Sequence, residues 1–219
     1  MRKVLGLLLL SVGVLLARPA TAQEESAVET LPQAEVLERL LTARHGPFNG
    51  KDGAALAQRV NNEAVAFVDL LRKRYAEYSF AGDRNSQLMF GRACAVLARI
   101  KHESALELLV AWQLRADAVA RELVNQKAEP ERLAAAWWHR NAVLAHIPVR
   151  VEPMTSKLIE ELPRLELDEQ WHTLKYLEKC CVGDGQVIAA LKEILTREGL
   201  EPIEKAHVEE TLGILSQAE

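Results

Sequence analysis

Apolar residues recur at helical spacing along most of this chain, and prolines and glycines interrupt the pattern at intervals. Between residues 54 and 78, for example, Leu56, Val60, Phe67 and Leu71 share one face of a continuous helix. Several prolines stand at expected helix starts, where a missing N–H group costs least. No segment shows the apolar and polar alternation of a strand. The sequence therefore predicts an all-α fold of about nine helices.

The prolines, glycines and capping residues also set the expected boundaries of these helices. A glycine-rich stretch at residues 45–53 predicts a loop, and the helix after it is expected to run unbroken to residue 78. The expected helices cover residues 32–44, 54–78 and 84–101, then start near 103, 130, 153, 168, 184 and 202, the last running nearly to the end.

Three segments repeat one design: an apolar helix end, a short polar turn and a second amphipathic helix. They are residues 95–109 (AVLARIKHESALELL), 142–159 (AVLAHIPVRVEPMTSKLI) and 174–195 (LKYLEKCCVGDGQVIAALKEIL). Over about residues 84–217 this pattern resembles HEAT-like repeats, most nearly the short bacterial kind found in PBS-lyase-type proteins. The resemblance implies a right-handed α-solenoid of stacked antiparallel helix pairs, whose second helices line a concave binding surface, and it implies no catalysis.

We therefore expect one helical-repeat domain over residues 32–219. Residues 32–80 would form capping helices at one end of the stack, and residues 84–217 would form the repeats. One helix pair cannot bury its apolar face alone, so each pair must stack on its neighbours. An irregular helical bundle is the alternative that the sequence leaves open.

The first 22 residues have the three zones of a cleavable signal peptide. Arg2 and Lys3 precede an apolar run at residues 4–16, and small residues at 20–22 predict cleavage after Ala22. An uncleaved anchor is the alternative, but thirteen helical residues span only about 20 Å of a hydrocarbon core about 30 Å thick. We expect a secreted or periplasmic protein with a flexible N-terminus at residues 23–31.

The charge of the mature chain points away from nucleic acid. Three of the 27 lysines and arginines lie within residues 1–22, which leaves 24 against 31 acidic residues, a formal charge of −7. A general nucleic-acid binder needs a basic face for phosphate. No later stretch is apolar and long enough to suggest a transmembrane segment, so a protein or peptide is the expected partner.

The cysteines and histidines are the residues that could provide redox or metal-binding chemistry. Cys94 falls in an apolar helix, whereas Cys180 and Cys181 are adjacent and could form a strained, reducible disulfide in an oxidising compartment. Core packing is the simpler interpretation, and a bridge between Cys94 and Cys180 stays open. His139 and His146 lie seven apart, not at the i, i+4 spacing of metal-binding helices.

Searches for a glycine-rich phosphate loop, a GxSxG turn and a CxxC pair find none in the sequence. We therefore predict a non-enzymatic binding scaffold with no catalytic, cofactor-binding or metal-binding residues. The alternative is a redox- or metal-dependent enzyme that uses Cys180 and Cys181 or a histidine site.

Two adjacent tryptophans, Trp137 and Trp138, are the most unusual feature of the expected binding region. Neighbouring helix residues point about 100° apart, so both rings cannot be centred in one core stripe. The simpler interpretation is that both pack between neighbouring repeats. The alternative places one ring at the edge of the core, where tryptophan commonly anchors a partner. Low aromatic content, 5% of residues, argues against an aromatic-lined sugar groove. The candidate partner-binding residues are Arg115, Arg121, Trp138, His139 and Lys157.

Overall fold

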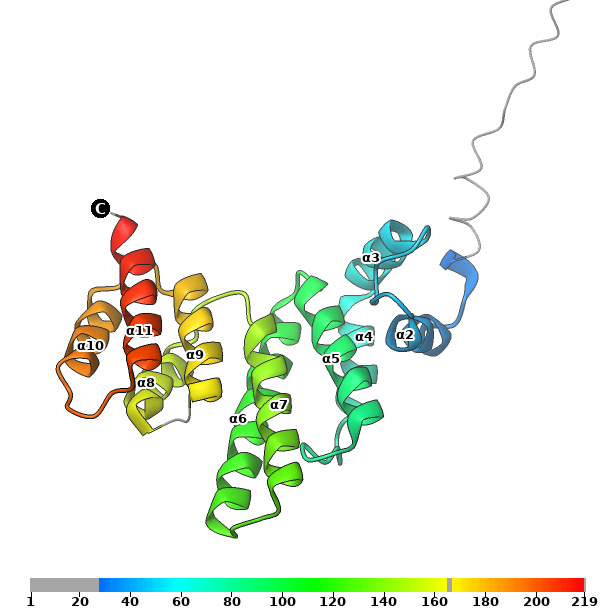
Figure 1. The fold of residues 1–219 in the computed structure, drawn as a ribbon. Coiled ribbons are helices and arrows are strands. Elements are labelled where there is room, and N and C mark those ends of the chain that lie inside the picture. The colour runs from blue at the N-terminus through cyan, green and yellow to red at the C-terminus, as the bar shows by residue number, and fades with distance from the viewer. Residues whose placement is uncertain (1–27, 165–166, 219) are drawn as a thin grey trace, which may run out of the picture.

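The computed structural model of the chain describes residues 28–164 and 167–218, and these residues form helices and no strands (Figure 1). The all-α prediction is confirmed. The expected signal peptide, and residues 23–27 of the expected flexible N-terminus, lie outside the described residues.

The α-helices are α2 (Gln33–Thr42), α3 (Gly53–Asn62), α4 (Ala64–Arg74), α5 (Arg84–Arg99), α6 (Glu103–Asn125), α7 (Pro130–His146), α8 (Glu152–Glu161), α9 (Leu167–Cys180), α10 (Gly185–Leu195) and α11 (Pro202–Leu215), with 3₁₀ turns η1 (Leu162–Arg164) and η2 (Ser216–Ala218).

The ten α-helices above and a short helical stretch at residues 28–30 make eleven helices in the described part of the chain, whereas the sequence predicts about nine. One difference arises because the expected helix 54–78 is two helices, α3 and α4, separated at Glu63, where φ is −112° and ψ is 32°. The Asn61 amide accounts for the break: it accepts a hydrogen bond from the Lys101 N–H and donates one to the Arg99 carbonyl, at 2.7 and 3.0 Å. These bonds fix the end of α3 against the end of α5.

Helices that are two apart in the sequence lie against each other. Helix α5 contacts α7, α7 contacts α9 and α9 contacts α11, and on the other side α4 contacts α6. Consecutive helices also pack in pairs, as α6 does with α7 and α10 with α11. Figure 1 shows the resulting elongated molecule, in which the chain advances from α2 and α3 at one end to α10 and α11 at the other. We refer to α5, α7, α9 and α11 as the odd-numbered layer; in the repeat units predicted from the sequence, α5, α7 and α9 are first helices and α6, α8 and α10 are second helices.

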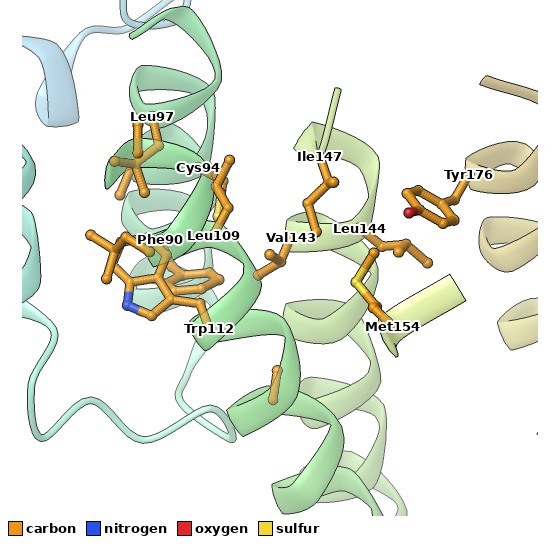
Figure 2. Packing of buried hydrophobic residues seen from close by; sticks show 14 of the residues in the cluster. Phe90, Cys94, Leu97, Leu109, Trp112, Val143, Leu144, Ile147, Met154 and Tyr176 are labelled. Atoms are coloured by element: carbon orange, nitrogen blue, oxygen red, sulfur yellow. The ribbon is translucent and has the colours of Figure 1, made fainter. Parts of the chain in front are cut away.

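One apolar core runs through the helix stack, from Val36 in α2 to Leu215 in α11. Figure 2 shows its middle, where buried side chains of α5 and α6 meet those of α7, and α7 in turn faces α8 and α9. The helix starts follow the expected chemistry, since Asp83 caps α5 and Asp184 caps α10 through side-chain oxygens that accept backbone N–H groups. Among the described residues, no helix is both long and apolar enough to cross a bilayer.

The described part of the N-terminal segment packs on α3. Val28 is buried, and the guanidinium of Arg59 donates hydrogen bonds to the carbonyls of Val28 and Leu31. A buried guanidinium needs such acceptors, because an unpaired charge is costly away from water. Arg59 therefore ties residues 28–31 to the first helices of the fold.

Candidate binding groove

Two neighbouring cavities form a groove over the odd-numbered layer. The larger, of about 1240 Å³, lies where α6, α7, α8, α9 and α11 meet. The smaller, of about 420 Å³, lies mainly between α5 and α7. Both are lined by Trp138, Asn141 and His172, so they adjoin at these three side chains. We call the joined cavities the tryptophan groove, because three of the four tryptophans of the chain line it: Trp137, Trp138 and Trp171.

Exposed apolar side chains concentrate in this groove. Eight large apolar residues are exposed in the described part of the chain, and four of them line the groove with 38% to 52% of their surface accessible. They are Leu88, Val124, Trp138 and Ile203. Several exposed apolar side chains around one groove are typical of an interaction site. Three tryptophans line this groove although aromatic residues are only 5% of the chain, because composition does not determine position.

The two adjacent tryptophans take different environments, as their 100° separation requires. Trp137 is half-buried, packs beside Ala120 and Leu123 of α6, and has the Arg140 guanidinium 5.3 Å from its ring centroid. Trp138 is exposed and lies against α5 at Gly91. Both line the groove, and Trp138 takes the edge position that the sequence left open as the alternative.

The five candidate residues do not form one site. Trp138 and Arg121 line the groove. Lys157 lies close to Arg121, since both bind Asp117. Arg115 lies elsewhere: it donates a 2.6 Å hydrogen bond to the Ala76 carbonyl and stacks over Phe80, so it holds α6 to the loop before α5.

Asp117 is the centre of a charge network that joins three helices at the floor of the groove. Its carboxylate lies 2.6 Å from Arg121 of the same helix, 3.1 Å from the fully buried Arg140 of α7 and 3.3 Å from Lys157 of α8. Arg121 also binds Glu161. Burial raises the pKa of Asp117, but Arg140 and Arg121 outweigh it and hold the pKa below its ordinary value. The Asp117 carboxylate is thus charged, and its ion pairs with Arg121, Arg140 and Lys157 hold the three helices together.

His139 is fully buried, which places it inside the molecule and not on a binding surface. Its Nδ1 lies 2.6 Å from the Ala135 carbonyl, which can only accept, so Nδ1 carries the proton. Its Nε2 then accepts from the Tyr78 hydroxyl at 2.8 Å. The ring packs among Tyr78, Phe80 and Phe90. Burial lowers the pKa of His139, so the imidazole is neutral at physiological pH.

This buried histidine predicts that stability falls in mild acid. The unfolded chain takes up the proton near pH 6.5, before the folded protein does, so the free energy of unfolding decreases as the pH drops below about 6.5. The slope for one proton is at most about 1.4 kcal/mol per pH unit. Urea denaturation at pH 5–8 measures it. The slope should shrink in His139→Gln and persist in His45→Gln, a change at an exposed histidine. Equal slopes in both variants would contradict the assignment.

The cysteines are free thiols in the structure. Cys94 and Cys181 are buried, and Cys180 is half-buried with its Sγ 3.9 Å from the Ile147 carbonyl. Burial raises the pKa of all three thiols, which disfavours the reactive thiolate. Within residues 28–164 and 167–218, no three or more histidine, cysteine or carboxylate side chains are grouped to hold a metal ion.

The sequence did not identify Trp171, Gly91 and Ile203 as residues of the groove. Trp171 lies three residues before Leu174 and six before Leu177, so it falls on the stripe that fills the core. In the structure its ring packs against His207 with centroids 4.7 Å apart, and the Lys175 ammonium lies 4.5 Å from the ring centroid. Only the packing of α9 against α7 and α11 brings Trp171 to the groove.

No protein-family model, curated protein or solved structure matches this chain. The functional interpretation therefore depends on the groove itself.

Proposed function

We propose that this protein is an exported, non-enzymatic helical scaffold that binds a segment of another protein in the tryptophan groove. The observation that carries the proposal is the position of Trp137, Trp138 and Trp171 around one cavity of about 1240 Å³. Tryptophan is among the residues most enriched at binding hot spots, because a large rigid ring contributes much contact area at low entropic cost.

We further propose that the fold is a right-handed HEAT-like solenoid of antiparallel helix pairs. The contacts of α5 with α7, α7 with α9 and α9 with α11 support this arrangement, since each pair then stacks on the next. The groove lies mainly over α5, α7, α9 and α11, which are the first helices of the repeat units predicted from the sequence, whereas the resemblance implies a binding surface on the second helices. Export is supported by the sequence of residues 1–22.

The proposal predicts that Trp138→Ala removes partner binding while the helical fold remains. Trp138 is 38% exposed, so its loss opens no core cavity, and truncation of a hot-spot residue typically costs at least about 2 kcal/mol of binding energy, more than tenfold in affinity. The measurement is cross-linking in the expressing cells followed by mass spectrometry, with circular dichroism of each purified variant as the check on folding.

Leu114→Ala is the matched control, because Leu114 is an exposed apolar residue of α6 outside the groove. We expect this variant to cross-link the same partner as the wild type. If Trp138→Ala and Leu114→Ala captured equal amounts, the groove would not be the binding site.

A further inference from the structure

The smaller cavity of the groove is a pocket that exists because the facing helices carry glycine and alanine there instead of larger side chains. Gly91 and Ala95 of α5 face Ala142 and Ala145 of α7 across about 420 Å³, with Leu88 at its edge, half exposed. A Cβ atom at Gly91 would lie 3.2 Å from Cη2 of Trp138. Glycine inside a helix costs about 0.5–1 kcal/mol relative to alanine, and here it lets the indole lie against α5 as one wall of the pocket.

Among the residues that line this pocket, Arg92 is the one that carries a formal charge at pH 7, and no carboxylate lines it. The imidazoles of His146 and His172 are the other ionisable groups in its lining. Within the described chain Arg92 has no ion pair, and one of its guanidinium nitrogens, Nη1, donates to the Leu41 carbonyl at 2.8 Å. The Nδ1 of His146 donates to the Ala142 carbonyl at 2.7 Å. An arginine without a counter-charge beside an apolar cavity favours a ligand that brings a carboxylate.

The walls of the pocket also restrict the backbone of the ligand. They come mainly from α5, α7 and α9, whose mid-helix N–H and C=O groups already bond within their own helices. An extended peptide placed there would lose its hydrogen bonds with water and find no backbone partners in exchange. A helical segment keeps its hydrogen bonds internal and presents only side chains.

We propose that the pocket between α5 and α7 binds an acidic amphipathic helix of the partner protein. An apolar side chain of that helix enters beside Trp138, and a neighbouring Asp or Glu carboxylate pairs with Arg92. This inference rests on the proposed function and specifies the chemistry of the partner.

The test uses two fluorescein-labelled helical peptides of 18 residues and the purified protein. Both peptides carry leucines at i, i+3, i+4 and i+7, and they differ only in whether glutamate or lysine flanks this stripe. Fluorescence anisotropy should give a Kd at least about tenfold lower for the glutamate peptide. Arg92→Gln should bring the two Kd values within about threefold of each other, whereas Arg92→Lys should keep most of the preference because it keeps the charge.

A second pair of variants tests the pocket separately from the charge. Ala95→Leu fills the cavity and should weaken the glutamate peptide by at least about tenfold. Ala118→Leu makes the same change at an exposed position of α6 outside the groove and should leave its Kd unchanged. Circular dichroism confirms that each variant is folded.

Equal affinity for the two peptides, no binding of the glutamate peptide, or an unchanged Kd in Ala95→Leu would each overturn the inference. A further outcome distinguishes this inference from the proposed function. A cellular partner that is lost in Trp138→Ala but retained in both Arg92→Gln and Ala95→Leu would uphold the binding scaffold and refute the acidic helix.

Discussion

Replacing Asp117 with asparagine is expected to lower the free energy of unfolding by about 3–5 kcal/mol, because it leaves the Arg140 guanidinium buried without its counter-charge. Arg140 is fully buried, and its remaining side-chain partners are the Thr173 hydroxyl at 3.4 Å and the Asn141 amide oxygen at 3.3 Å, both neutral. Urea denaturation followed by circular dichroism measures the change.

Asp69→Asn is the control for this prediction. Asp69 makes a comparably short contact, 2.6 Å to Arg72, but its side chain is 59% exposed, so its loss should cost less than about 1 kcal/mol. The double variant Asp117→Asn, Arg140→Met removes both buried charges and should recover part of the lost stability. If it were as unstable as the sum of the two single variants, the buried charge would not be the cause.

The helices were predictable because their signals are local. Apolar spacing, prolines and capping residues act within a few residues, and they placed the starts of α5, α7, α10 and α11 close to where the structure has them. The division of the expected helix 54–78 was not predictable in this way. It depends on the Asn61 side chain binding Arg99 and Lys101, about forty residues away.

The candidate site was predictable only in part, and for the same reason. Trp138 could be identified because neighbouring helix residues diverge, which is a local rule. His139 could not be assigned to the interior, because the ring that binds its Nε2 belongs to Tyr78, 61 residues earlier. Asp117 and Arg140 lie 23 residues apart on different helices, and nothing in their local sequence distinguishes them from charges on a solvated face.

Phe90→Ala is expected to destabilise the protein by about 3–5 kcal/mol, the usual cost of removing a buried phenylalanine. The Phe90 ring of α5 is fully buried, and Figure 2 shows it beside the Trp112 ring of α6. Its neighbours come from three separate regions of the chain, so the cavity cannot close by moving one of them. Ring centroids within 5.0–5.6 Å of Phe90 belong to Tyr75, Tyr78, Phe80, Trp112 and His139.

Leu88→Ala, two residues earlier in α5, should have the opposite effects on stability and on peptide binding. Leu88 is half exposed at the edge of the groove, so its truncation should change the free energy of unfolding by no more than about 0.5 kcal/mol. It should instead weaken binding of the glutamate peptide, which Phe90→Ala should leave nearly unchanged under conditions where that variant remains folded. Urea denaturation and anisotropy on both variants measure this separation. A loss of binding in Phe90→Ala with Leu88→Ala unaffected would mean that Leu88 makes no contact with the bound peptide.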